Sequence, residues 1–276
     1  MPSTTSNTSG KQWLLIDVGN THTVAGLHPE VDAKATLSNG SVRPTIQVRF
    51  RTDAQATADE YRAHLTQLFA ASASHSQLTP TRVIASSVVP SLEPAIRGAF
   101  EPAAKVTLIS SATARDFDLD LPNPESLGAD RLANVAGALV LAKAPFLIVD
   151  AGTATTFCLV DARRVYIGGA IVPGLETSWR ALTARAAKLS AVPLIRTESS
   201  IGRTTETQIQ SGVLQGYEAL IEGMADRLLR DAGPEFSSRA TLFATGGIIN
   251  LLKLSPRFRI EADLTLMGLL RYGQLT

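Results

Sequence analysis

Two similar stretches, at residues 13–27 and 146–160, constrain the fold of this chain more than any other feature. Each is an apolar run that ends in an aspartate, at Asp17 and Asp150, and continues through a glycine into a polar, threonine-containing turn. This pattern predicts a buried strand, a tight turn and a second strand. Because the two stretches align without gaps, the chain looks like an internal duplication.

The polar turns carry groups that suit a phosphate chain and its metal ion. A glycine turn offers backbone N–H groups, the threonines add hydroxyls, and the aspartate at the strand end can face a cation. Asn20, Thr21 and Thr23 supply the first turn, and Thr153, Thr155 and Thr156 supply the second. His22 lies in the first turn as well, where it either contacts a phosphate or is solvated.

Length and composition are those of a globular protein of two domains. The chain has 276 residues, of which 45% are hydrophobic and 18% charged, and this leaves ample core for two domains. We expect a disordered leader at 1–12, an N-terminal domain at 13–145 and a C-terminal domain at 146–276. The leader lacks the basic and apolar regions of a signal peptide.

Charge and cysteine content exclude several classes of partner. A formal net charge of +1 gives no electrostatic attraction to nucleic acid or to an anionic membrane. No segment has the length and apolarity of a membrane span. The single cysteine, Cys158, rules out an internal disulfide and is compatible with a reducing cytoplasm.

Hydrophobic patterning predicts a mixed sheet in the first half of the chain. Strands at 13–18, 24–27 and 46–51 form a meander, and Thr52 or Asp53 is able to cap a helix over 54–72. Further strands are expected at 82–88 and 106–110, with Pro90 in the first turn of a helix that ends near Phe100. Ligands on such sheets lie near strand ends and helix N-termini.

The second half repeats a strand-rich start and then becomes helical. After the hairpin we expect a strand at 166–172, a Gly/Pro turn, a helix at 175–189, and a long helix at 206–231. A strand at 241–244 leads into Thr245-Gly246-Gly247 and a helix from Ile248 onward. The last segment, 264–272, is an apolar helix expected to return between the halves. The glycine pair at Gly246 could let a nucleotide base lie on bare backbone, although such pairs are common.

A polar segment, Gly128 to Arg131, opens an alanine-rich helix predicted over residues 132–143. Asp130 and Arg131 therefore lie in its first turn. Asp130 either faces a substrate hydroxyl or only favours the helix N-terminus, and Arg131 either binds an anionic group or is solvated. Thr205 and its neighbour Thr204 are open to a similar choice, because either hydroxyl could be an N-cap or a ligand.

Several common nucleotide and hydrolase motifs do not occur in the sequence. There is no G-x-x-x-x-G-K-[ST] P-loop, no G-x-G-x-x-G fingerprint and no G-x-S-x-G nucleophile elbow. The four histidines show no metal-ligand spacing. A phosphate site in this chain therefore has to come from the duplicated turns.

The ordered set of motifs resembles type III pantothenate kinase, within the acetate and sugar kinase, heat-shock chaperone and actin superfamily. The motifs are DVGNT at 17–21, LGADR at 127–131, DAGTATT at 150–156, GGAIVPG at 168–174, GRTT at 202–205 and ATGG at 244–247. The resemblance implies an α/β fold of two ribonuclease-H-like domains, each with a mixed five-stranded sheet flanked by helices. It also implies ATP-dependent phosphorylation of pantothenate to 4'-phosphopantothenate, the first step of coenzyme A synthesis, by a cytoplasmic homodimer.

The resemblance also implies roles for individual residues. Asp130 corresponds to the general base, Asp150 to the ligand of a monovalent cation such as K⁺ or NH₄⁺, and Asp17 to a residue near Mg²⁺. The expected ATP contacts are Asp17, Val18, Gly19, Asn20, Thr21, His22, Thr23, Val24 and Thr153. The expected pantothenate contacts are Leu121, Gly128, Ala129, Asp130, Arg131 and Thr205. Leu121 departs from the family pattern, in which a tyrosine is common at that place.

Two other functional classes remain open at the sequence level. The chain could be a nucleotide-gated regulatory protein that hydrolyses ATP without a small-molecule acceptor. It could also be a phosphatase, or a kinase for another hydroxyl compound, because a fold alone does not fix the acceptor. GADR and GRTT favour pantothenate through the resemblance only.

Overall fold

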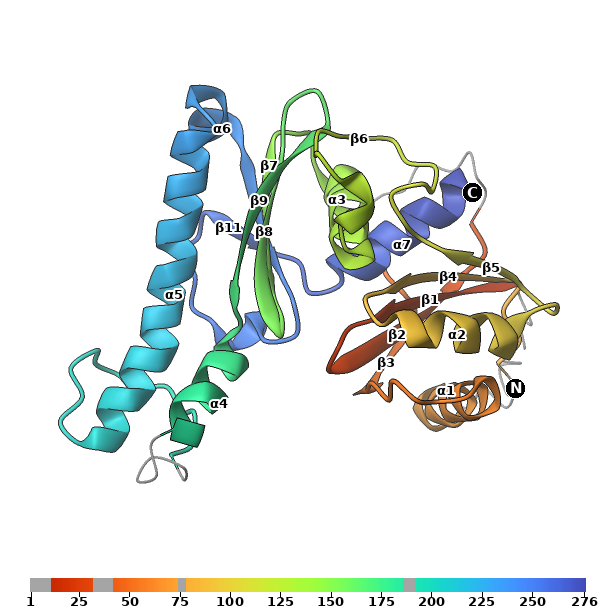
Figure 1. The fold of residues 1–276 in the computed structure, drawn as a ribbon, viewed down its shortest axis with the longest axis horizontal. Helices are drawn as coiled ribbons and strands as arrows, with labels where there is room; N and C mark the ends of the chain where they lie inside the picture. The colour runs from red at the N-terminus through yellow and green to blue at the C-terminus, as the bar shows by residue number, and fades with distance from the viewer. Residues whose placement is uncertain (1–10, 32–41, 74–77, 186–191) are drawn as a thin grey trace, which may run out of the picture. The chain divides into compact units, whose positions relative to one another are not determined.

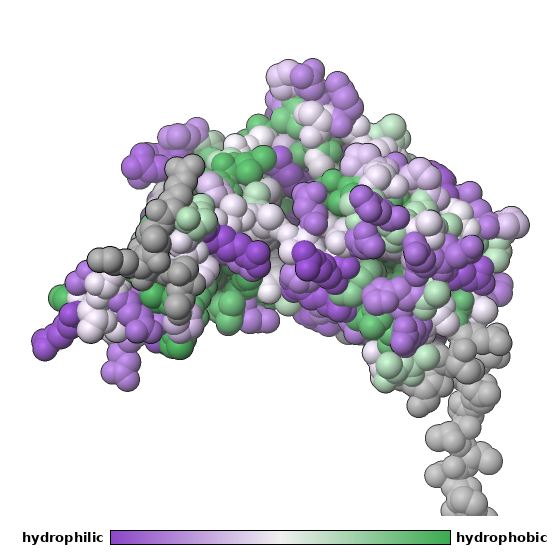
Figure 2. All heavy atoms as spheres, turned by 60° about the horizontal axis from the view of Figure 1, so that its bottom comes forward, coloured by the Kyte–Doolittle hydropathy of each residue, from purple (hydrophilic) through white to green (hydrophobic). Residues whose placement is uncertain are grey.

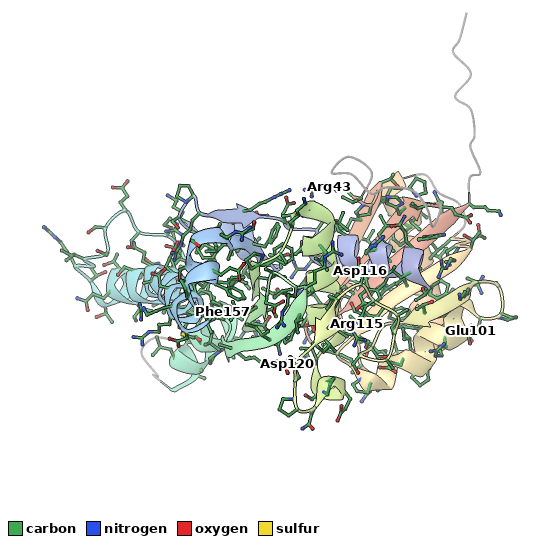
Figure 3. The ribbon with its side chains drawn as sticks, turned by 90° about the horizontal axis from the view of Figure 1, so that it is seen from above. Arg43, Glu101, Arg115, Asp116, Asp120 and Phe157 are labelled. Carbon is green, nitrogen blue, oxygen red and sulfur yellow. The ribbon has the colours of Figure 1, made fainter. Side chains whose placement is uncertain are left out.

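The chain divides into two compact units in the computed structural model, which describes residues 11–31, 42–73, 78–185 and 192–276. Unit 1 comprises residues 1–115, 125–141 and 265–276, and unit 2 comprises residues 116–124 and 142–264. Arg115 and Asp116, both labelled in Figure 3, are the residues at which the chain first passes from unit 1 to unit 2. Most of the expected leader, residues 1–10, lies outside the described residues.

The chain does not divide once at residue 145 as expected. Two segments belong to the unit on the other side of that boundary. The C-terminal helix α7 (Leu264–Leu275) belongs almost wholly to unit 1, where Arg82 Nη1 donates to Gly273 O at 2.6 Å. Residues 116–124 belong to unit 2 because the short strand β6 (Asp118–Leu119) pairs with a strand of that unit. Both assignments rest on contacts between residues distant in sequence.

Unit 1 is built on a mixed five-stranded sheet in the order β3-β2-β1-β4-β5. Its strands are β1 (Gln12–Val18), β2 (His22–Pro29), β3 (Ile46–Arg51), β4 (Arg82–Ser87) and β5 (Lys105–Leu108). The β1-β2-β3 meander is antiparallel, whereas β4 runs parallel to both β1 and β5. The predicted meander and the two later strands are confirmed.

The alternation of side chains along β1 assigns its two faces to different helices. Leu14, Ile16 and Val18 are fully buried in a core that includes residues of α1 (Ala58–Ala73) and α2 (Glu93–Phe100). The alternate residues Trp13, Leu15 and Asp17 therefore face the other side. There α7 approaches, and Figure 1 shows α3 (Ala129–Leu141) beside α7.

Helix α1 begins later than the sequence pattern predicted. Thr57 Oγ1 and Thr57 N both donate to Glu60 Oε2, at 2.8 and 2.9 Å, so a capping box starts the helix at Ala58. The prediction that Thr52 or Asp53 caps this helix is wrong. Thr52 instead bonds to the turn between β1 and β2.

Unit 2 is built on a six-stranded sheet in the order β11-β10-β7-β8-β9-β6. Its longer strands are β7 (Phe146–Ala151), β8 (Ala154–Val160), β9 (Val165–Pro173), β10 (Thr241–Thr245) and β11 (Phe258–Ile260). The predicted five strands become six because β6 adds to the edge. Phe157, labelled in Figure 3, is fully buried in the core of this unit.

Helices cover the unit 2 sheet along one face in Figure 1, where the long α5 (Thr205–Asp231) runs beside the strands. Tyr217, Ile221 and Ala225 of α5 pack in the same core as Leu147 and Val149 of β7. The described part of α4 is Leu175–Arg185, and α6 (Pro234–Arg239) is a short helix that the sequence pattern did not predict. The helix expected from Ile248 is wrong, because only a single 3₁₀ turn, Ile249–Leu251, forms there before β11.

The strand orders confirm the duplication. Omitting β6, the unit 2 order β9-β8-β7-β10-β11 repeats the unit 1 order β3-β2-β1-β4-β5 strand for strand. The parallel and antiparallel pairings also match, since β10 runs parallel to β7 and to β11. The two aspartate turns therefore occupy equivalent places, each at the end of a central strand. No helix within the described residues is long and apolar enough to cross a membrane.

Candidate active site

The first turn joins β1 to β2 and is held closed by its own backbone. Val18 pairs with Thr23, and Gly19 N donates to His22 O at 3.1 Å. Val18 and Thr23 are buried while Asn20 and His22 are exposed, so the middle of the turn faces solvent. Thr52 closes the turn from the side of β3, where its hydroxyl donates to Gly19 O at 2.7 Å.

Asp17, at the end of β1, is held by a residue that the sequence pattern did not single out as a ligand. Ser86 stands beside Asp17 in the parallel pairing of β1 with β4, and its hydroxyl donates to Asp17 Oδ1 at 2.6 Å. Ser86 is fully buried, whereas Asp17 is half-buried. One carboxylate oxygen is therefore fixed by the protein, and the side chain is ordered before any cation arrives.

Asp130 lies in the first turn of α3, as predicted. Its Oδ1 accepts from the N–H of Arg131 at 2.8 Å, so the carboxylate satisfies one of the free donors of the helix N-terminus. Burial raises the pKa of Asp130 above its usual range, against the lowering effect of the Arg131 N–H and guanidinium. A half-buried carboxylate of raised pKa in the first turn of a helix is suited to general base catalysis.

Gly128 leaves the space that the Asp130 carboxylate occupies. A Cβ built on Gly128 would lie 2.5 Å from Asp130 Oδ1, with Val88 at 3.7 Å. The residue before the helix is therefore a glycine because a larger side chain would displace the carboxylate. Gly128 O also accepts from Arg131 N and Leu132 N, which ties this segment to the first turn of α3.

Asp17 and Asp130 belong to the same unit and to the same face of its sheet. Asp17 points to the face away from α1 and α2, and Figure 1 shows α3 on that side. Gly128, just before α3, is close to Val88, which follows the last residue of β4. The two carboxylates are thus placed at the carboxyl ends of β1 and β4, the position at which mixed α/β sheets bind ligands.

The second turn joins β7 to β8 and is one residue shorter than the first, because Ala151 pairs with Thr155 whereas Val18 pairs with Thr23. Asp150 pairs with Thr156, and Gly152 N donates to Ala154 O at 3.2 Å. Thr153 is exposed, whereas Thr155 is buried and bonds to the hydroxyl of Tyr217. Of the threonines in this turn, Thr153 thus offers its side chain to solvent and Thr155 is a core residue.

Two later glycines pack tightly on the backbone of the second turn. A Cβ on Gly174 would lie 2.1 Å from Gly152 O, and Gly174 N donates to Thr153 O at 3.0 Å. Gly246 has a positive φ of 105°, and a Cβ there would lie 2.5 Å from Ala151 N. The expectation of close backbone approach near the paired glycines is met at Gly169, whose Cβ would overlap Phe157 O. At Gly246 the close partner is the second turn itself.

The remaining predicted substrate contacts are more dispersed. Thr204 is the N-cap of α5 and forms a capping box with Thr207, so Thr205 is the first helical residue and is exposed. A cavity of about 460 Å³ lies beside it, lined by Thr197, Ser199, Ile201, Gly202, Arg203, Thr204 and Thr207. Leu121 is half-buried and belongs to unit 2, whereas Gly128, Ala129, Asp130 and Arg131 belong to unit 1.

Metal binding in the described residues does not rest on a cluster of protein ligands. No group of three or more histidine, cysteine, aspartate or glutamate side chains that could hold a metal ion occurs in the ranges that the structure describes. A single carboxylate such as Asp17 still suits magnesium, because Mg²⁺ in kinases is bound by one or two carboxylates together with substrate phosphates and water.

Comparisons with known proteins assign the chain to a family. The sequence profile of the family described as Type III pantothenate kinase matches residues 13–227. The chain belongs to this family. A Type III pantothenate kinase of Thermus thermophilus is 36% identical over 263 residues, which cover 94% of this chain and 97% of the relative. One of Thermomicrobium roseum is 36% identical over 260 residues, with 93% and 94% covered.

Solved structures share the fold of this type III pantothenate kinase family member at low sequence identity. A putative 2-dehydro-3-deoxygalactonokinase of Sinorhizobium meliloti superposes with a TM-score of 0.57 at 12% identity, covering 95% of both chains. A conserved putative Baf family transcriptional activator of Campylobacter jejuni gives 0.55 at 17% identity, covering 94% of this chain and 96% of that one. These two structures thus share with this chain the predicted α/β fold of two mixed sheets with flanking helices.

Proposed function

We propose that this protein transfers the γ-phosphoryl group of ATP to the primary hydroxyl of pantothenate and forms 4'-phosphopantothenate, the first step of coenzyme A synthesis. Family membership over residues 13–227 supports the reaction. The observation that carries the proposal at the level of the site is Asp130, a half-buried carboxylate of raised pKa that is held at the start of α3 by its bond to Arg131 N. It lies at the same end of the unit 1 sheet as the first phosphate turn.

The two aspartate turns would bind the nucleotide phosphates. Residues 17–24 would form the first site, in which the exposed middle of the turn would present backbone N–H groups and the side chains of Asn20 and His22. Thr153 in the second turn is exposed and would add a further contact. Positioning by such groups supplies most of the catalysis in phosphoryl transfer, because the protein forms no covalent bond to the phosphorus.

Asp130 would act as the general base. As the pantothenate hydroxyl oxygen bonds to the γ-phosphorus, its proton passes to a carboxylate oxygen of Asp130 and ADP leaves. Only the ionised carboxylate can accept this proton, and a raised pKa makes Asp130 a stronger base than an ordinary aspartate. The guanidinium of the adjacent Arg131 would bind the pantothenate carboxylate, with Gly128, Ala129, Leu121 and Thr205 as further contacts.

The proposal includes two cations, for which Asp17 and Asp150 are the candidate residues. When bound, they neutralise phosphate charge that would otherwise repel an anionic acceptor. Asp17 suits Mg²⁺, because Ser86 fixes Oδ1 and orients the carboxylate. Asp150 is half-buried at the equivalent strand end and is proposed as a ligand of a monovalent cation such as K⁺ or NH₄⁺.

A cytoplasmic homodimer is also part of this proposal. The one cysteine, Cys158, is buried and has no second cysteine in the chain with which to form a disulfide, which suits a reducing compartment. Large apolar side chains in unit 2 are exposed, among them Ile201 at 78% and Ile171 at 62%, and a second subunit could cover them. Figure 2 shows apolar patches set among hydrophilic residues on one face of the molecule. Sedimentation of the purified chain would test the dimer.

The test of the proposed function is phosphoryl transfer with purified full-length protein. ATP, Mg²⁺ and pantothenate are supplied, and K⁺ or NH₄⁺ is either added or withheld. We expect phosphopantothenate only when the monovalent cation is present. ATP hydrolysis with no phosphorylated acceptor under any cation would reject pantothenate and favour a nucleotide-gated regulatory protein.

A further inference from the structure

One residue, Thr52, fixes one side of the turn between β1 and β2. Thr52 follows the last residue of β3, and its backbone N–H donates to Thr21 O at 3.0 Å. Its hydroxyl donates to Gly19 O at 2.7 Å. One residue therefore holds two carbonyl groups of the turn.

The Thr52 hydroxyl is itself oriented by a buried neighbour. Thr23 Oγ1 lies 3.0 Å from Thr52 Oγ1, and Thr23 is fully buried at the start of β2. Because Thr52 gives its only hydroxyl proton to Gly19, the proton between the two threonines comes from Thr23. The hydrogen bonds therefore run from Thr23 to Thr52 and from Thr52 to Gly19, and together they fix the rotamer of Thr52.

Fixing a carbonyl on one side of a turn also fixes an N–H group on the other. The peptide bonds here are trans, since the cis bonds of the described residues are both elsewhere, at Pro102 and Pro145. In a planar trans peptide the C=O and the following N–H point in opposite directions. Anchoring Gly19 O and Thr21 O on Thr52 therefore turns the N–H groups of Asn20 and His22 away from Thr52.

We propose that Thr52 is a positioning residue for nucleotide binding, which holds the β1–β2 turn with its N–H groups directed at the phosphates. The proposal rests on the proposed function, in which this turn binds ATP. Thr52 would act through the turn backbone, since its hydroxyl is already engaged with Gly19 and Thr23. Removing the hydroxyl would free the turn and leave the Gly19 carbonyl without this donor.

The variants that test this proposal change the hydroxyl and the methyl group of Thr52 separately. Thr52→Val removes the hydroxyl and keeps the shape, whereas Thr52→Ser keeps the hydroxyl. Thr66→Val is the matched control, because the Thr66 hydroxyl donates to the Arg62 carbonyl at 2.8 Å on the exposed side of α1. Thermal unfolding of each variant shows whether it is folded at the assay temperature.

The main readout is equilibrium binding of the non-hydrolysable analogue AMPPNP with Mg²⁺, measured by calorimetry. For Thr52→Val we expect affinity to fall about five- to tenfold, the usual effect of one lost hydrogen bond. The affinities of Thr52→Ser and Thr66→Val for AMPPNP should stay within about twofold of that of the unchanged protein. Such a change is smaller than the effect of one lost hydrogen bond. In turnover assays the KM for ATP should rise in Thr52→Val while the KM for pantothenate stays constant.

Amide hydrogen exchange in the nucleotide-free protein provides a readout that is independent of activity. We expect faster exchange at residues 19–22 in Thr52→Val and unchanged exchange in Thr52→Ser. Unaltered AMPPNP affinity in Thr52→Val would overturn the proposal, as would equal loss in Thr52→Ser, which would assign the effect to packing. If the protein binds AMPPNP but never phosphorylates pantothenate, the proposed function fails while calorimetry still decides the role of Thr52.

Discussion

Asp130, the proposed base, lies where its surroundings disfavour its charged form. Its burial raises the pKa of the carboxyl, which means that the folded state binds a proton more tightly than the unfolded chain. Folding is therefore favoured by Asp130 below the unfolded pKa, and this contribution is lost as pH rises through the raised pKa. At neutral pH the charge on this half-buried carboxylate therefore lowers stability, a cost that its proposed role as a base would explain.

This cost predicts that Asp130→Asn is at least as stable as the unchanged protein at pH 7. The amide is neutral and has no ionisation to disfavour, so the slope of stability against pH between the unfolded and folded pKa values should become flatter. Urea unfolding at several pH values measures this slope. A clear loss of stability at neutral pH would mean that the charged carboxylate stabilises the fold.

Gly128 predicts a separation of activity from stability at the same place. In Gly128→Ala the new methyl group would lie 2.5 Å from Asp130 Oδ1, and a carboxylate at the end of a side chain can move aside. We expect turnover to fall by about tenfold or more, because a small displacement of a base is costly, while the melting temperature changes little. Steady-state kinetics and calorimetric melting measure the two effects; unchanged kcat would contradict the argument.

At the residue scale, the sequence predicted the aspartates but not the groups that hold them. Asp17 and Asp130 stand out because each follows a recognisable local pattern. Ser86 and Thr52 do not, since Ser86 lies 69 residues from Asp17 and Thr52 lies 33 residues from Gly19. Only the register of β1 with β4, and of β2 with β3, brings these hydroxyls to the turn.

At the level of the structural elements, the second turn is packed by glycines. Their place in the sequence does not show which backbone they contact. Gly174 and Gly246 both pack on the backbone of the second turn. The strands and the hairpins were predictable, because alternation and length indicate them locally. The two-residue strand β6 and the single turn after Gly247 were not, since long-range pairing alone defines them.

The packing of Gly174 predicts a large loss of stability on substitution. A methyl group on Gly174 would overlap Gly152 O at 2.1 Å, and both are backbone positions that cannot rotate aside. Gly174→Ala should cost more than about 2 kcal/mol of unfolding free energy, as overpacked sites do. Urea denaturation gives the value.

The matched control is Gly216→Ala in α5, where a Cβ would meet nothing within 4 Å. An alanine in an open helical position should stabilise by about 0.5–1 kcal/mol. Equal effects of the two substitutions would contradict the close packing of Gly174 on the second turn.

On the scale of the whole molecule, duplication has produced two equivalent turns with different surroundings. Asp17 accepts a hydrogen bond from Ser86 of the neighbouring strand β4. The residue in register with Asp150 on β10 is Thr245, which is buried. The duplication was visible in the sequence because the two turns align. The last helix was expected to return between the halves, but the assignment of α7 to unit 1 and of residues 116–124 to unit 2 was not visible, because it depends on packing between distant segments.

The two aspartates should therefore differ in the cation that each controls. We expect Asp17→Asn to raise the Mg²⁺ concentration needed for half-maximal activity, and Asp150→Asn to raise the corresponding K⁺ concentration, each by about tenfold or more, as loss of a charged ligand implies. Titration of each variant with one cation at saturating levels of the other measures this. A shift in the same cation for both variants would reject separate roles.

One comparison decides whether Asp130 is the base for pantothenate phosphorylation. Transfer from γ-labelled ATP to pantothenate is followed in a single turnover for the unchanged protein and for Asp130→Asn, with AMPPNP binding measured in parallel. We expect labelled phosphopantothenate from the unchanged protein and transfer that is slower by about a hundredfold or more in Asp130→Asn. The two proteins should bind AMPPNP with equal affinity. Near-normal transfer by Asp130→Asn would contradict the role of Asp130 as the base.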